Sequence, residues 1–296
     1  MLDIHRLRLL RELDRLGTLA AVARALNYSP SAISQQLSLL ESETGATLLE
    51  HVGRGVRLTA QARILVRHTE AILERMELAE AELAASMTKV TGTLRVASFQ
   101  SVALALVPGA LSDLGARHPA LRVQLTQLDA GPAFAGLLAH DFDLVLGEDY
   151  PGHARTRLPG VDEETLARDE IRCAVPPDGP WHRATLAELA GAPFVFDPAG
   201  LSPGDWARQL CRVAGFEPDA RFVSTDLLFQ TRLVETGHAV AFVPDLLWTD
   251  RDRGAIELIA LPGRPTRRVY TVVRSGSAEQ PAIQAFRQAL RERLTA

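Results

Sequence analysis

Four short polar side chains on one face of a predicted helix are the residues in this chain best suited to reading a nucleic acid. Ser31, Ser34, Gln35 and Ser38 recur at spacings of three and four, so a helix that begins at Pro30 presents them together. A merely solvated helix face is usually rich in Lys, Glu and Arg, whereas this face carries almost no charge. Hydroxyl and amide groups bond base edges and phosphates in a major groove. The pattern therefore favours a helix that contacts DNA.

Local signals predict where this helix begins and ends. Ser29 is a suitable N-cap, and Pro30 at the first helical position loses no hydrogen bond there. The helix is predicted to run to Gly45. Its other face carries an apolar stripe at i, i+4 and i+7, formed by Ile33, Leu37 and Leu40. This stripe should pack the helix onto a core.

The preceding residues predict a partner for this helix. Thr18 is a suitable N-cap for an Ala-rich helix over 19–26, which is slim enough to let a second helix cross it closely. Residues 27–29 then form a short turn, and residues 3–15 read as a first, bracing helix. This order of elements is the helix-turn-helix arrangement: a helix, a short turn and a second helix with a polar N-terminal face. In that arrangement the second helix reads DNA.

Residues 48–59 read as two short strands around a Gly-Arg-Gly tip. Such a tip suits a wing, because the glycines permit the turn. Arg54 and Arg57 are then placed to contact phosphates or a minor groove. Arg54→Ala is expected to weaken binding to all DNA sequences alike.

These segments resemble the LysR-type family of bacterial transcriptional regulators. The match is close over the winged helix, and its residues are Ala23-x-x-Leu26, Ser29-x-Ser31-Ala32-Ile33-Ser34-Gln35-Gln36-Leu37, Leu40-Glu41, Gly45, Leu48-Leu49 and Arg54-Gly55-Val56-Arg57-Leu58-Thr59. It continues more loosely to the C-terminus. The resemblance implies a winged-helix domain followed by a two-lobed α/β domain of the periplasmic-binding-protein type. It also implies a sequence-specific regulator of transcription that binds double-stranded DNA and a small-molecule effector, and that forms homodimers and homotetramers.

A long helix without Gly or Pro is predicted from Ala60 to about Met87. Its apolar positions alternate spacings of four and three, at Leu65, Thr69, Ile72, Met76, Ala79 and Leu83. A helix lying on a globular core is one interpretation, but Glu residues leave only this narrow stripe apolar. We favour a linker helix that forms a dimer, because a helix-turn-helix generally reads two half-sites as a dimer. The predicted domains are then 1–59 for DNA binding, 60–91 for the linker helix and hinge, and 92–296 for regulation.

The net charge of −4 is unevenly distributed along the chain. Residues 1–68 carry nine Arg against six acidic residues, or +3, whereas residues 69–88 carry one Arg against five Glu, or −4. Positive charge is therefore concentrated on the predicted helix-turn-helix, as binding to phosphates requires.

From residue 92 onward, strand-like runs alternate with helices, which is typical of a mostly parallel sheet covered on both faces. The segment is too long for one sheet of ordinary size. Together with the family resemblance, this predicts two lobes, with the chain crossing between them near 161–168 and 262–268. Lobe I then comprises 92–160 and 269–296, and lobe II comprises 161–268.

A ligand of such a domain is expected beyond the carboxyl ends of the strands. The residues selected in this way are Ser98, Phe99, Gln100, Ser101, Asp129, Gly147, Phe196, Asp197 and Thr225. We interpret Asp226 as an N-cap, since caps strongly prefer Asp. The selected set contains carboxylates but no Arg or Lys. It favours an effector that carries an amine or another cation, or a zwitterion, over a dicarboxylate.

The sequence does not favour an enzyme. It contains no Gly-rich phosphate loop, nucleophile elbow or zincin spacing, and no Cys/His cluster with metal-ligand spacing, so neither a metal nor a cofactor is expected. A solute-binding protein without DNA function is a further alternative, which the winged helix and the lack of a signal peptide oppose. With no apolar run long enough to span a membrane, we expect a cytoplasmic protein. Cys173 and Cys211 lie in apolar contexts that favour inert thiols over a redox pair.

Overall fold

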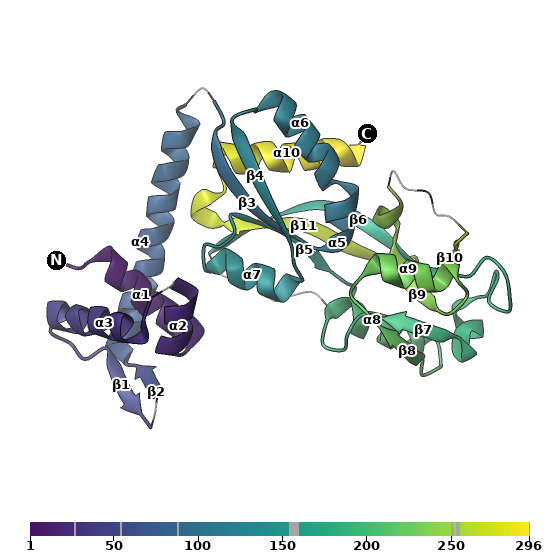
Figure 1. Ribbon diagram of the computed structural model, residues 1–296, viewed down its shortest axis with the longest axis horizontal. Helices are drawn as coiled ribbons and strands as arrows, with labels where there is room; N and C mark the ends of the chain where they lie inside the picture. Colours follow the sequence, from purple (N-terminus) through teal and green to yellow (C-terminus); the bar gives the residue numbers. More distant parts are fainter. Residues whose placement is uncertain are drawn as a thin grey trace. The chain divides into compact units, whose positions relative to one another are not determined.

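The computed structural model describes residues 1–26, 28–53, 55–87, 89–153, 160–249, 252 and 255–295, which fall into two compact units, Met1–Leu83 and Ala84–Ala296. The first unit contains α1 (Ile4–Leu16), α2 (Leu19–Leu26), α3 (Pro30–Thr44), β1 (Leu49–Val52), β2 (Gly55–Leu58) and most of α4 (Ala60–Ala85) (Figure 1). Its core is formed by the buried faces of α1 to α4. The predicted stripe on α3 belongs to this core, because Ile33, Leu37 and Leu40 are fully buried.

Capping residues determine where these helices begin and end. The Ser29 hydroxyl accepts a hydrogen bond from the Ala32 amide at 3.1 Å, and Gly45 ends α3 in a left-handed conformation with φ of 65°. Asp3 caps α1 in the same way, and Gly17 ends it with φ of 75°. The predicted start and end of the recognition helix are therefore confirmed.

The second unit contains a large sheet with helices packed against it. Its elements are β3 (Gly92–Ser98), α5 (Gln100–Ala105), α6 (Val107–Arg117), β4 (Leu121–Gln127), α7 (Ala130–Leu138), β5 (Leu144–Asp149), β6 (Val161–Val175), η1 (Leu186–Gly191), β7 (Pro193–Phe196), α8 (Ser202–Val213), β8 (Asp219–Val223), α9 (Leu227–Glu235), β9 (Val240–Pro244), η2 (Asp245–Trp248), β10 (Glu257–Ala260), β11 (Thr266–Arg274), η3 (Ser275–Ser277) and α10 (Pro281–Thr295). Separate apolar clusters form beside the two halves of the sheet, one around Leu94 and Phe286 and another around Phe194 and Phe196. The unit thus has two lobes.

The strand order is β4-β3-β5-β11-β6-β9-β7-β8, with β10 paired to β6. Strands β3, β4 and β5 are parallel, as are β7, β8 and β9, but β6 and β11 are antiparallel to their neighbours. The prediction of a mostly parallel sheet was therefore wrong. Two neighbouring parallel strands need a crossover connection, usually a helix. The chain has such helices within each lobe but not where it passes between the lobes.

Strand β6 joins the two lobes into one sheet. Its first part, Val161–Glu170, pairs with β11, and its later part, Ile171–Ala174, pairs with β9. The segment predicted as a crossing near 161–168 is thus itself part of a strand. One sheet extends through both lobes, contrary to the expectation that the segment is too long for a single sheet.

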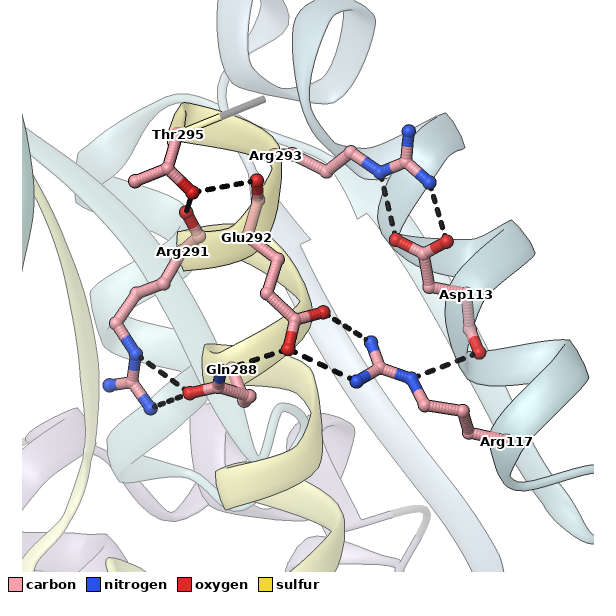
Figure 2. Close-up of polar contacts among 7 residues, drawn as sticks. All are labelled: Asp113, Arg117, Gln288, Arg291, Glu292, Arg293 and Thr295. Carbon is pink, nitrogen blue, oxygen red and sulfur yellow. Dashed lines mark hydrogen bonds and ion pairs between the residues drawn. The ribbon is translucent and has the colours of Figure 1, made fainter.

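Helix α10 returns to lobe I and lies beside α6 (Figure 1). Figure 2 shows two ion pairs between these helices: Arg117 Nη2 lies 2.7 Å from Glu292 Oε2, and Arg293 Nε lies 2.8 Å from Asp113 Oδ2. Gly109 permits this approach, since a Cβ there would lie 2.8 Å from Arg293 Cδ. Both pairs lie at the surface, where solvent screens them, so they contribute little to stability. The buried apolar face of α10, which includes Ile283 and Phe286, holds the helix against lobe I.

Candidate functional site

The exposed face of α3 carries the four side chains selected from the sequence. Ser31, Ser34, Gln35 and Ser38 are all exposed. The Ser31 hydroxyl lies 3.0 Å from that of Ser29. The side chains of the other three make no hydrogen bond within the described part of the chain, so their donors and acceptors are open to a partner.

Neighbouring polar side chains have structural roles instead. The Thr18 hydroxyl accepts from the Ala21 amide at 3.1 Å and so caps α2, as predicted. Gln36 differs from Gln35 because its Oε1 accepts from Arg6 Nε at 3.0 Å. Arg6 also pairs with Glu43, so α1 is tied to α3 at two points.

The wing is a two-stranded antiparallel ribbon of β1 and β2. Glu41 of α3 holds its base, because its Oε1 accepts from the Leu48 and Leu49 amides at 2.7 and 3.0 Å. Arg57 is exposed, but its Nη2 lies 2.7 Å from Glu50 Oε2 on the facing strand. Arg54 lies outside the described residues. A phosphate would have to compete with Glu50 for Arg57.

We expect Glu50→Gln to strengthen binding to DNA of any sequence by a few-fold. The substitution frees Arg57 and removes a negative charge near the phosphates, so the dependence of affinity on salt should steepen by about one phosphate contact. Fluorescence anisotropy with random duplex DNA at several salt concentrations measures both quantities. Glu217→Gln is a matched control, since it opens an equally exposed pair with Arg212 in the second unit. An equal gain in the control would mean that Glu50 has no local effect.

The predicted apolar seam of α4 divides into two parts. Leu65 is half-buried against the core of the first unit, and Thr69 is buried, with its hydroxyl donating to the Leu65 carbonyl at 2.7 Å. The remaining members are exposed: Ile72, Met76, Ala79 and Leu83. The exposed fractions of Ile72, Met76 and Leu83 are 41%, 47% and 62%. This part of the seam is therefore an exposed apolar face of the single chain.

The second unit contains a cavity of about 660 Å³ to which both lobes contribute. It collects most of the residues predicted from the strand ends, namely Phe99, Gln100, Ser101, Asp129, Phe196, Asp197 and Thr225. Ser98 and Gly147 do not line it. Ser98 is fully buried and its hydroxyl donates to the Phe99 carbonyl, while the Tyr270 ring covers Gly147, where a Cβ would approach it to 2.7 Å.

Arg267 corrects the expectation that no cation lines this cavity. Its side chain is 2% exposed, and its guanidinium donates to Asp169 Oδ2 at 2.7 Å, to Glu148 Oε2 at 2.6 Å and to Ser101 Oγ at 2.7 Å. Asp169 in turn accepts from the Leu246 amide at 2.9 Å. The arginine thus connects α5, β5 and β6 beneath the cavity. Arg267 lies in the segment predicted as a crossing near 262–268, and its sequence context gives no sign of its burial.

Carboxylates outnumber this arginine among the described lining residues. Burial raises the pKa of Glu148, although Arg267 opposes the shift. Asp149 accepts from the Tyr270 hydroxyl at 3.0 Å and pairs with Arg268 at 2.6 Å. Asp129 is exposed, and burial raises the pKa of Asp197 to about 6. The lining is therefore negatively charged at neutral pH.

Gln100 links the two lobes across this cavity. Its Oε1 accepts from the Leu227 amide at 2.7 Å, and its Nε2 donates to Asp226 Oδ1 at 2.9 Å. Asp226 also accepts from the Leu228 amide and caps α9, which confirms its prediction as an N-cap. Gln100 therefore lines the cavity and is bonded to the other lobe.

The two cysteines are buried, free thiols. Burial raises the pKa of Cys211 to about 12 and that of Cys173 still further above its usual range. Both thiols are thus protonated at neutral pH and poor nucleophiles. Among the described residues, no group of three or more His, Cys, Asp and Glu side chains could hold a metal ion. None of the described helices is long and apolar enough to cross a membrane.

Residues 88–295 match the protein family described as "LysR substrate binding domain". The chain belongs to the LysR family. Residues 4–63 match a second family description, "Bacterial regulatory helix-turn-helix protein, lysR family". The chain is therefore a DNA-binding transcriptional regulator of the LysR type with a substrate-binding effector domain, and not an enzyme. Regulators of the LysR family bind DNA and small-molecule effectors and form oligomers.

Named relatives agree with this assignment. The chain is 27% identical to the regulator TcbR of Pseudomonas sp. (strain P51) over 77% of this chain and 78% of that protein. It is 25% identical to the dual regulator OxyR of Escherichia coli (strain K12) over 96% of this chain and 95% of that protein. Among solved structures, a full-length variant of OxyR from Pseudomonas aeruginosa has a TM-score of 0.67 at 18% identity, covering 98% of this chain and 95% of the other. CbnR in complex with its target DNA has a TM-score of 0.55 at 24% identity, covering 99% of each chain.

Proposed function

We propose that this LysR-type regulator reads its operator through α3 and the wing, as a dimer whose DNA-bound arrangement changes when an effector enters the cavity between the lobes. The exposed, nearly uncharged hydrogen-bonding face of α3 is the observation that carries this proposal. Ser34 and Gln35 are the proposed base contacts, and Ser31 and Ser38 contact bases or phosphates. The remaining proposed contacts are Thr18, Ser29 and Pro30 at helix N-termini and Arg54 and Arg57 in the wing.

The proposed division of labour follows the chain. Residues 1–59 bind DNA, residues 60–91 pair two chains and form the hinge, and residues 92–296 bind the effector. Lobe I comprises 92–160 and 269–296, and lobe II comprises 161–268. We propose that the protein acts in the cytoplasm.

A second interface, which would make a tetramer, is supported by apolar side chains on lobe II. Val223 at the end of the edge strand β8 is 56% exposed, and Phe229 of α9 is 47% exposed. An unpaired strand edge beside exposed apolar side chains is a surface that association would cover. The proposed assembly is therefore a homodimer through α4 that pairs again through the regulatory domains.

The effector is proposed to carry an amine or another cation, or to be a zwitterion. Four carboxylates of the described lining, Asp129, Glu148, Asp149 and Asp197, share the cavity with one lining guanidinium, that of Arg267, while Arg268 pairs with Asp149 from outside the lining. Arg267 is itself paired with Asp169, which lies outside the lining, so the excess of negative charge remains. A ligand of positive charge would neutralise it, whereas a dicarboxylate would increase it.

A binding assay tests this function. It compares the affinity of the protein for a fluorescent fragment of its own upstream promoter with its affinity for random DNA of equal length. Measured at two salt concentrations, a regulator should prefer the promoter and show a steep salt dependence. Equal and weak binding to both fragments would favour a binding protein without a DNA function.

Gln35→Ala should lower the preference for the promoter over random DNA by about tenfold or more. A side chain that reads a base edge contributes about 1–3 kcal/mol of discrimination at each site, whereas a side chain that holds phosphates affects all sequences alike. The same binding assay measures both affinities. Gln280→Ala removes a side chain of the same type from the second unit and should change neither of the two affinities. Equal losses on both DNA fragments would contradict the role of Gln35 as a reader.

A further inference from the structure

We propose that the cavity takes an organic ammonium ion, with the ammonium group on Asp197 and the apolar body against an aromatic wall formed by Phe196, Trp206 and Phe242. This inference rests on the proposed function of the cavity as the effector site and specifies the class of compound. It is carried by the contacts of Asp197 and by the distribution of aromatic side chains.

Asp197 differs from the buried carboxylates around it because it lacks a cationic partner among the described residues. Its carboxylate receives one long hydrogen bond, from Gln230 Nε2 at 3.4 Å. Arg208 lies close, but its Nη1 donates to the backbone carbonyl of Asp197 at 3.1 Å. Glu148 and Asp149, by contrast, are each held by an arginine at 2.6 Å. Among the largely buried carboxylates of this cavity, Asp197 is therefore the one that a cationic ligand could neutralise.

Aromatic side chains line the same cavity as this carboxylate. The chain has ten Phe, three Trp and three Tyr, and seven of these sixteen line the cavity. Phe196 immediately precedes Asp197, and its ring centroid lies 6.2 Å from that of Phe242. Phe242 meets Trp206 edge-on at 6.0 Å, which makes the wall continuous. Aromatic faces attract ammonium groups and accommodate apolar bodies, so the wall and Asp197 suit the two ends of one ligand.

Arg267, the cationic side chain among the described lining residues, does not suit an anionic ligand. The guanidinium of Arg267 already donates to Asp169, Glu148 and Ser101. A carboxylate ligand would have to displace one of these buried partners and would add charge to an acidic lining. The geometry therefore favours a monocation over an acid.

The burial of Asp197 makes the affinity for such a ligand dependent on pH. Since its pKa in the free protein is raised to about 6, the carboxylate is ionised above this pH and mostly protonated well below it. An ammonium ion binds the ionised form, so its affinity should rise as the pH increases through about 6 and then level off. Binding of a carboxylate ligand should change in the opposite direction.

Calorimetry on the full-length protein with three probes of similar shape tests the charge preference. The probes are 2-phenylethylamine, 3-phenylpropionate and 2-phenylethanol. At about pH 7.5 the amine should bind at least about tenfold more tightly than either of the others, and its affinity should fall about tenfold at about pH 5. Tighter binding of the propionate, or no binding of the amine up to about 10 mM, would overturn the proposal.

Asp197→Asn should abolish amine binding together with its pH dependence. Glu217→Gln, which alters an exposed carboxylate of the second unit outside the lining, should retain amine binding. Trp206→Leu should weaken amine binding about tenfold through the loss of the aromatic contact, and it tests the site should the Asp197 variant fail to fold. Amine affinity unchanged in both Asp197→Asn and Trp206→Leu would refute the site.

Promoter binding by the same samples separates this inference from the proposed function. A wild-type protein that prefers its promoter but ignores the amine contradicts only the ammonium class. A protein that neither prefers its promoter nor binds the amine contradicts both.

Discussion

Replacement of Ile72 and Met76 by Asp should convert the protein to a monomer and lower its operator affinity by about a hundredfold or more. These side chains are 41% and 47% exposed in the single chain, so the substitutions should hardly affect the folding of the monomer. In the proposed dimer they would bury two carboxylates in each chain at an apolar seam, which is prohibitive. A monomer engages one half-site only and loses the gain in affinity that comes from linking two.

Light scattering after size exclusion measures the mass, and a gel-shift titration with the operator measures the affinity. Ala71→Asp with Arg75→Asp is the matched control, because it adds the same carboxylates to exposed positions of α4 next to the seam. The control should keep its oligomeric state. An unchanged mass for the seam variant would mean that the chains pair elsewhere.

Arg267→Met should destabilise the second unit by about 3–5 kcal/mol. The variant keeps most of the side-chain volume but leaves Asp169 and Glu148 buried without their cation, and uncompensated buried charges are costly. The midpoint of thermal unfolding should fall by about 10 °C. Circular dichroism during heating and during urea titration measures the loss.

Two further variants test the cause of this effect. Arg212→Met breaks an exposed pair with Glu217, which solvent screens, and should leave the midpoint of thermal unfolding nearly unchanged. Combining Arg267→Met with Asp169→Asn and Glu148→Gln removes the stranded charges and should restore part of the stability. If the triple variant is no more stable than the single one, packing rather than charge explains the loss.

The recognition helix could be predicted from the sequence because its signals are local. Ser29, Pro30 and Gly45 act on backbone groups within one turn of themselves, and the structure uses each of them in the expected way. The residues after β3 show the limit of such reasoning. Their apolar run would suit one continuous helix, but it is divided between α5 and α6 at Leu106, where Pro108 follows within the first turn of α6.

Strand β6 has the apolar pattern of a buried strand only at its end, because its first half is acidic. Asp162, Glu163 and Glu164 give no alternating apolar pattern, yet they lie in the sheet. Their partners come from distant segments: Arg268 pairs with Glu163, and Arg287 pairs with Asp162 at 2.8 Å. Ion pairs made across more than a hundred residues leave no signal in the local sequence.

The cavity was predictable to the extent that strand ends define it. Phe99 and Asp197 follow buried strands, so the general rule for α/β sheets found them. Trp206 lies on α8 and Arg267 begins a strand that links the lobes, so their positions depend on how the lobes meet. No periodicity within either segment carries that information.

The chain returns to lobe I only near its C-terminus, and this affects how the protein folds during its synthesis. Strand β5 pairs with β11, and α10 supplies part of the core beneath them, but β11 begins more than a hundred residues after β5 ends. At a synthesis rate of about 5–20 residues per second, β3, β4 and β5 wait on the order of ten seconds for their partners. The unit Met1–Leu83 has no such wait, since its apolar core is built from its own residues. During synthesis on the ribosome, the DNA-binding unit should therefore fold before lobe I of the regulatory domain is complete. The strands of lobe I that are already synthesised are then where a chaperone is most needed.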